Sequence, residues 1–324
     1  MKQKNRILVQ IALIVALGGL LMGFDASVIS GVIQFIEVEF ALTKLELGWA
    51  VASLTLTATL AMMVAGPLSD RFGRRTILRY AAILYTLSAI GSAFAPSFIW
   101  LVVARMVGGF GVGASLILAP MYIAEMAPPR IRGRLVSFNQ LNIVIGISLA
   151  FFTNYLILQF AKSDASWAQS FGFNQYNWRW MLGLEALPAI LYYLGLFFVP
   201  KSPRWLILKG EFEKAKEVMS RFNSEKDTEE VIAQMIEKNN NPGVKKEGKI
   251  SDLFKPAMRL VLTIGIVVAV LQQITGINSV FFYAPMIFEQ SGIGTDASFM
   301  QAILVGVVNL VFTLLAMYFI DRLG

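Results

Sequence analysis

The sequence predicts an all-α protein that crosses a membrane several times, and three observations support this fold class. Of the 324 residues, 56% are hydrophobic and 15% are charged, whereas a soluble domain carries about 25% charged residues. The apolar residues fall in runs of about twenty, the length that a helix needs to cross a hydrocarbon core. The chain lacks the short alternating segments of membrane barrels, so helices are left to satisfy the backbone polar groups in lipid.

Eight apolar segments are long enough to span the membrane. They cover residues 7–33, 46–69, 76–96, 98–124, 134–160, 178–200, 257–290 and 298–320. The amino end superficially resembles a signal peptide, because basic residues precede an apolar stretch. That stretch runs on to Gly31 without a clean cleavage site, so we interpret it as a retained first span.

Basic residues predict the orientation of the spans. Arginines gather at 71–79 and 130–134, lysines gather in 201–255, and the loops between these positions carry few cations. Because basic loops stay in the cytoplasm, we expect a multi-pass inner-membrane protein with a cytoplasmic N-terminus. The net charge of +7 is then explained by topology and by lipid rather than by nucleic acid.

A polar insert divides the chain into three predicted parts. Residues 1–200 form a six-helix membrane bundle, 201–255 a cytoplasmic linker with short amphipathic helices, and 256–324 the start of a second bundle. The tetrad Asp70-Arg71-Phe72-Gly73 follows the second span, and Asp321-Arg322-Leu323-Gly324 follows the eighth. This repeat indicates duplicated halves, and we expect the chain to be a fragment that stops in the second half.

Composition excludes several classes of chemistry. The chain has no cysteine and no histidine, which rules out disulfides, thiolate or imidazole metal sites and Ser-His catalysis. No nucleophile–base pair is visible either. We therefore expect no enzyme, no metal, no cofactor and no obligate protein partner.

The turn at 66–75 joins two spans and contains Gly66, Asp70, Gly73 and several arginines. Arginines alone suffice as an orientation signal. Fixed Asp and Gly residues favour a gate, because glycine permits close helix approach and the carboxylate accepts hydrogen bonds from arginine. At the 4–5 turn, Glu125 and Arg132 are a candidate ion pair for closing the same side, or a static surface pair worth less than about 1 kcal/mol.

Two charged residues lie inside spans. Arg105 opens a glycine-rich stretch whose Gly109 and Gly113 predict close helix packing. An arginine in a span is costly and faces a partner or a wet cavity. Asp25 lies within the first span, where it is either a fixed counter-ion for Arg105 or a carboxylate that takes up and releases protons. We favour the second interpretation.

Neutral amides interrupt other spans and offer both donors and acceptors, which suits an uncharged polyol. They are Gln140, Gln272, Gln273, Asn278 and Asn309. Interhelical bonding is the simpler interpretation for a lone Asn, whereas the run 272–278 favours a binding face. Gly276 within that run predicts a break or bend in the helix. Phe282 and Tyr283 follow, and either ring can stack on a sugar or pack.

Several motifs, which occur in the same order as in the family, resemble the sugar porter family of the major facilitator superfamily. They are most similar to those of bacterial sugar–proton symporters of the xylose and galactose type. They are the turn at 66–75, the Arg105 segment, 122–128 with 132–133, 177–181, 200–206 and 272–278. The resemblance covers the whole chain. It implies the major facilitator fold, with a complete N-terminal six-helix bundle and the first two helices of a C-terminal bundle.

The resemblance also implies a transport mechanism, in which sugar binds midway across the membrane and the two bundles rock. Asp25 falls where proton-coupled members have an acid, with Arg105 as its partner. The sugar-contact positions are Gln140, Ile147, Gln272, Gln273, Asn278, Tyr283 and Asn309, and Ile147 resembles a glucose-type pocket. The cytoplasmic gate positions are Gly66, Asp70, Arg71, Gly73, Arg74, Arg75, Glu125, Arg132, Glu185, Arg204, Asp321 and Arg322.

One departure concerns the gate. The family pattern Pro-Glu-Ser-Pro-Arg reads Pro-Lys-Ser-Pro-Arg at 200–204 here. The charge reversal at Lys201 removes one expected ion pair.

Three functional hypotheses remain open. The first is proton-coupled uptake of a neutral monosaccharide, with the proton as coupling ion and the bilayer, sugar and protons as its partners. The second is an uncoupled facilitator or polyol carrier, and the third is a sugar sensor. Asp25 distinguishes the first from the second.

Overall fold

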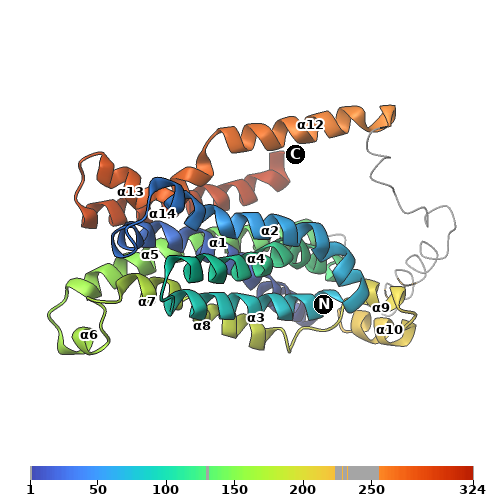
Figure 1. The fold of residues 1–324 in the computed structure, drawn as a ribbon. Helices are drawn as coiled ribbons and strands as arrows, with labels where there is room; N and C mark the ends of the chain where they lie inside the picture. The colour runs from blue at the N-terminus through green and yellow to red at the C-terminus, as the bar shows by residue number, and fades with distance from the viewer. Residues whose placement is uncertain (1, 129–130, 223–227, 229–231, 233–254, 324) are drawn as a thin grey trace.

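The computed structural model describes residues 2–128, 131–222, 228, 232 and 255–323, and this part of the chain is helical without strands (Figure 1). The long helices are α1 (Lys2–Glu39), α2 (Lys44–Phe72), α3 (Arg74–Ala93), α4 (Phe98–Met126), α5 (Arg132–Lys162), α12 (Pro256–Ile274), α13 (Ile277–Gln290) and α14 (Thr295–Leu323). The short helices are α6 (Ser166–Ser170), α7 (Asn177–Gly183), α8 (Ala186–Gly195), α9 (Pro203–Leu208) and α10 (Phe212–Ser220).

Seven helical segments in the described residues are long and apolar enough to cross a membrane. The polytopic all-α fold class is therefore confirmed. The predicted span 178–200 is the exception, because it is divided into α7 and α8. Pro188 explains the break: it has no N–H for the Leu184 carbonyl, and that carbonyl instead accepts from Leu187 N–H at 3.2 Å.

The predicted span 257–290 also contains a break, as Gly276 predicts. Gly276 has a φ of +71° and separates α12 from α13. This left-handed conformation is one that glycine adopts without a steric cost. The expectation of a break or bend at Gly276 is confirmed.

The bundle is built on three close helix pairs, in which α1 packs on α5 and both α2 and α3 pack on α4. α14 packs on α5 and α13, whereas α12 has its main contacts with α13 and runs along the outside of the bundle (Figure 1). The helices α9 and α10 lie at one end of the bundle and α6 lies at the other. The division at 200 and 255 stays a prediction, since much of that insert lies outside the described residues.

Glycine makes the α2–α4 contact possible. A Cβ added to Gly113 would lie 2.1 Å from the Ala58 carbonyl oxygen, and one added to Gly109 would lie 2.4 Å from the Leu54 carbonyl oxygen. Both distances are far below van der Waals contact with backbone atoms that cannot rotate away. The predicted role of Gly109 and Gly113 in close packing is confirmed.

We therefore expect Gly113→Ala to push α2 and α4 apart and to destabilise the bundle by about 1–3 kcal/mol, seen as a lower melting temperature in detergent. Gly48→Ala is the matched control, because Gly48 lies in α2 with no atom within 4 Å of the added Cβ. Equal melting temperatures for the two variants would contradict this account.

Candidate functional site

A buried ion pair lies in the middle of the bundle. Arg105 Nη1 on α4 is 3.1 Å from Asp25 Oδ1 on α1, and the side chains are 2% and 1% exposed. Arg105 also donates to the carbonyl oxygens of Ala50 and Asp25. The expected contact between Asp25 and Arg105 is thus present, and it ties α1, α2 and α4 together.

Glu185 belongs to this same cluster. It is 2% exposed, and it lies within electrostatic range of Asp25 and Arg105. Its assignment to the gate is therefore wrong: the break between α7 and α8 places the carboxylate halfway along the sixth span. Two buried carboxyl groups and one guanidinium form what we call the central cluster, Asp25, Arg105 and Glu185.

A second cluster closes the end of the bundle that carries α9, which we call the arginine-rich end. Arg74 is buried at the start of α3. It contacts Asp70 Oδ1 at 2.7 Å and Glu125 Oε1 at 3.1 Å. The other Glu125 oxygen accepts from the Ser202 hydroxyl, just before α9. One arginine thereby joins the 2–3 turn, the end of α4 and the segment that leads into α9.

The candidate pair between Glu125 and Arg132 is not formed. Arg132 is exposed, and its Nε donates to the Ala127 carbonyl oxygen at 3.4 Å. Glu125 is instead buried against Arg74, because the 2–3 turn brings the start of α3 onto the end of α4. Glu125 thus lies at the predicted end of the bundle, but its partner is Arg74 instead of Arg132.

Trp205 on α9 covers the 2–3 turn. Its Nε1 donates to the Asp70 carbonyl oxygen at 3.1 Å, and its ring would lie 3.2 Å from a Cβ at Gly73, whose φ is +93°. Lys201 places its ammonium 5.0 Å from the centre of the same ring. The reversed charge therefore has a cation–π contact here. Trp205 was given no role from the sequence, although it lies within the motif at 200–206.

Other gate residues have weaker or more local contacts. Arg75 Nη1 donates to the Val199 carbonyl oxygen at 2.9 Å. Arg71 lies over the Phe72 ring and Arg204 is exposed. Gly66 has open space around it. The side chains of Asp321 and Arg322 lie outside the described residues.

The structure brings together part of the predicted sugar-contact set. Asn278 Nδ2 donates to Gln273 Oε1 at 2.9 Å across the break at Gly276. Ile147 is buried in an apolar cluster with Ala284 and Ala302, where α5 meets α13 and α14. Tyr283 and Asn309 are half-buried, and Gln140, Gln272, Gln273 and Asn278 are exposed.

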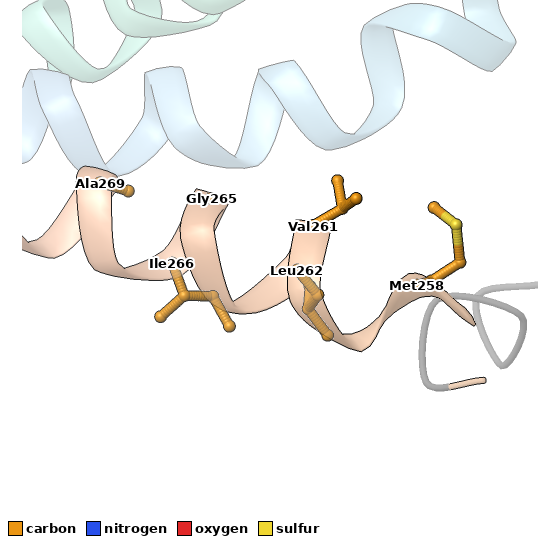
Figure 2. Close-up of a pocket in the computed structure, with 6 residues that line it drawn as sticks. All are labelled: Met258, Val261, Leu262, Gly265, Ile266 and Ala269. Atoms are coloured by element: carbon orange, nitrogen blue, oxygen red, sulfur yellow. The ribbon is translucent and has the colours of Figure 1, made fainter. Parts of the chain in front are cut away.

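Two hollows of the described surface are lined mainly by apolar residues. One of about 340 Å³ is lined by α12 alone, through Met258, Val261, Leu262, Gly265, Ile266 and Ala269 (Figure 2). These residues form one apolar face of the helix, which is the pattern of a surface that packs on another helix. A larger hollow of about 710 Å³ lies between α3 and α7–α8.

Together these features define a class: a multi-pass helical membrane protein with charged clusters at its centre and at one end. The model of the family "Sugar (and other) transporter" matches residues 11–324. The chain belongs to this family of membrane transporters, and not to a family of enzymes. The resemblance predicted from the motifs is confirmed.

Individual relatives agree. The arabinose-proton symporter of Bacillus subtilis (strain 168) is 38% identical over 95% of this chain and 64% of its own length. The D-xylose-proton symporter of Escherichia coli (strain K12) is 36% identical over 97% of this chain and 67% of its own. The chain thus spans about two thirds of the length of these relatives.

Solved structures give the same result. A major facilitator superfamily proton:xylose symporter, XylE, bound to 6-bromo-6-deoxy-D-glucose has a TM-score of 0.86 at 35% identity, covering 99% of this chain and 70% of its own. The inward open form of the xylose transporter from E. coli has a TM-score of 0.78 at 34% identity, covering 97% and 70%. The expected major facilitator fold is confirmed.

The cluster at the arginine-rich end generates a stability prediction. We expect Arg74→Ala to destabilise the protein by about 3–5 kcal/mol, because the buried Glu125 carboxylate loses its partner. Adding Glu125→Gln should recover part of the loss, since the uncompensated charge disappears. Thermal unfolding of the single and double variants in detergent measures both effects.

Arg71→Ala is the control for this pair of variants, because Arg71 is exposed on the same turn. We expect it to change stability by no more than about 0.5 kcal/mol. If Glu125→Gln worsens the Arg74→Ala variant, charge pairing is not what the cluster contributes.

Proposed function

We propose that this chain carries the proton-coupling part of a secondary active transporter that takes up a neutral monosaccharide, a hexose or a pentose, by alternating access. The central cluster is the observation that carries the proposal. Family membership and the proton symporters among the relatives support it.

Charge balance in the central cluster argues for a bound proton. Asp25 and Glu185 are both buried, and Arg105 is the cation that acts on them. One guanidinium compensates one carboxylate, so a second carboxylate would be an uncompensated buried charge costing several kcal/mol. A proton on either carboxyl removes that cost. Loading and release of this proton then depend on how close Arg105 lies to each acid.

The arginine-rich end supplies the gate. We assign this end to the cytoplasm, because basic loops remain on that side. Arg74, Glu125 and Ser202 join three segments there, and opening the end requires these contacts to break. Since Asp70 is largely exposed and Glu125 is buried, the bond to Glu125 is the stronger constraint.

We assign sugar recognition to the amides on α5 and at the α12–α13 break, which are Gln140, Gln272, Gln273 and Asn278. The hydrogen-bonded pair Gln273–Asn278 leaves further donors and acceptors for hydroxyl groups. Ile147 places an apolar surface between α5 and α13, which suits the carbon face of a ring. Amides without charge favour a neutral ligand over an ion.

An uncoupled facilitator or polyol carrier is the second candidate. It is favoured by the direct hydrogen bond between Arg105 and Asp25, which is also what a fixed counter-ion would make. The two candidates differ in whether sugar uptake moves protons.

We expect Asp25→Asn in the full-length protein to abolish uphill sugar accumulation and to preserve exchange of labelled sugar across liposomes. The amide cannot bind and release the coupling proton, while exchange requires no net proton movement. Asp164→Asn, in an exposed loop, is the control and should behave as wild type. Equal loss of accumulation and exchange would argue against a coupling role.

Sugar uptake is also expected to acidify the interior of liposomes, measured with an enclosed pH dye. A panel of hexoses, pentoses and inositol identifies the substrate through competition. Uptake of any of these without acidification would favour the facilitator.

A further inference from the structure

The contact between α5 and α14 joins the two predicted bundles. α14 packs on α5, and α13 packs on α1 and α14. The buried positions among the described side chains of α14 are Ser298, Phe299, Ala302 and Gly306. They recur every three or four residues, so they share one face. Beyond Gly306 the side chains up to residue 319 are exposed or half-buried, so the close contact covers the first half of α14.

An ion pair lies at one end of this contact. Lys162, the last residue of α5, places its Nζ 2.5 Å from Asp296 Oδ1 in the first turn of α14. Gln159 Nε2, one turn earlier on α5, donates to the same oxygen at 3.4 Å. Since α5 leads into α6, this is the end of the bundle opposite to the arginine-rich end (Figure 1). By the orientation assigned above, it is the outer end.

A second contact lies midway along both helices. Ser148 Oγ donates to the Gly306 carbonyl oxygen at 3.0 Å, and a Cβ added to Gly306 would lie 3.1 Å from Ser148 Cα. Ser148 precedes Lys162 by fourteen residues, or about 21 Å at the helical rise. Because glycine leaves no side chain to interlock with α5, α14 can tilt about this contact without losing it.

An apolar cluster fills the space around and above the mid-span contact. Ile147 and Phe151 on α5 pack with Ala302 on α14 and with Ala284 on α13. Ile147 is one of the predicted sugar-contact residues, so α14 covers the side of α5 on which sugar is expected to bind. Separation of the outer ends of α5 and α14 would uncover this side.

We propose that Lys162 and Asp296 form a latch that closes the outer end of the sugar path, and that the contact of Ser148 with Gly306 is the fulcrum on which α14 tilts when the latch opens. Gln159 supports the latch, because it holds the same carboxylate. The inference rests on the function proposed above and deepens it, since uptake by alternating access requires the outer end to open.

The weakness of the pair suits it to a latch. The side chains of Lys162 and Asp296 are 50% and 53% exposed, and an exposed ion pair shifts an equilibrium by a factor of about two to five. Breaking a buried pair, such as that of Arg74 with Glu125, is far more costly. A contact that opens in every transport cycle should give the closed state only a small advantage, and salt should reduce that advantage.

A cysteine reporter measures the opening of the outer end. The chain has no cysteine, so Ala302→Cys in a full-length protein without other cysteines places one thiol between the latch and the fulcrum. Ala302 is 1% exposed, so a closed latch protects the thiol from a membrane-impermeant maleimide added on the outer side. We expect Lys162→Glu and Asp296→Lys each to raise the rate of labelling by about twofold to fivefold.

The controls separate charge pairing from other effects of these substitutions. The double variant Lys162→Glu/Asp296→Lys restores an ion pair and should label at nearly the rate of the parent. Lys44→Glu is the matched control, because Lys44 pairs with Glu37 at 2.5 Å at the same end but within the first bundle, and it should leave labelling unchanged. Parent-like labelling in both single variants, or no recovery in the double variant, overturns the latch.

Cross-linking distinguishes the fulcrum from the latch. A Cβ at Gly306 would lie 3.2 Å from Ser148 Oγ, which is close enough for Ser148→Cys/Gly306→Cys to form a disulfide. We expect this disulfide to leave exchange of labelled sugar at the rate of the reduced protein. A short, cleavable thiol reagent across Lys162→Cys/Asp296→Cys should stop exchange until it is cleaved. If the mid-span disulfide stops exchange, or the outer cross-link does not, the proposed roles are wrong.

The outcome for the latch is separate from the outcome for the proposed function. Labelling of Ala302→Cys requires neither sugar nor protons. It can therefore fail to support the latch while Asp25→Asn upholds proton coupling. If Asp25→Asn instead retains uphill accumulation, the coupling role fails whatever the labelling shows.

Discussion

The structure depends on one contact, the ion pair of Asp25 with Arg105. Two charges this far from water need very close partners, because the desolvation cost exceeds what a loose pair returns. The helices can approach closely enough because glycine lines their contacts: Gly108 lets Asp25 reach α4, and Gly113 lets α2 do the same. The ion pair at the centre therefore requires close packing of the helices, since a bundle with wider spacing would leave both charges unpaired.

The arginine-rich end uses a different arrangement of charge. There Arg74 is buried, and its two partners differ in exposure: the Asp70 side chain is largely in solvent, whereas the Glu125 side chain is buried. Arg74 can therefore lose its contact with Asp70 at little cost in stability and keep its contact with Glu125. Trp205 adds a non-ionic layer over Gly73 that ionic strength does not weaken. Lys201 joins this layer rather than an ion pair, so the charge reversal at 201 changes the kind of contact and keeps the segment in place.

Much of this could be predicted from the residues. Asp25 and Arg105 were predictable as partners because a charge in an apolar span must find one, and Gly109 and Gly113 as a close contact because their spacing puts them on one face. Glu185 was misplaced although it lies within the predicted span 178–200, because only the packing of the sixth span shows that it lies near Asp25 and Arg105. Glu125 was given the wrong arginine, since three arginines lie near it in sequence and only the fold selects Arg74.

The break at Pro188 has a mechanical consequence. A continuous helix moves as a rod, and its two ends are displaced together. The sixth span instead has a pivot at Leu184–Glu185, where the ladder of backbone hydrogen bonds is interrupted. α8 leads directly to the segment that Arg75 and Tyr122 hold through the carbonyl oxygens of Val199 and Pro200. A tilt of α8 that begins at Val199 and Pro200 would therefore rotate the Glu185 side chain at the pivot. A movement at the membrane surface would in this way change the electric field at the bilayer midplane.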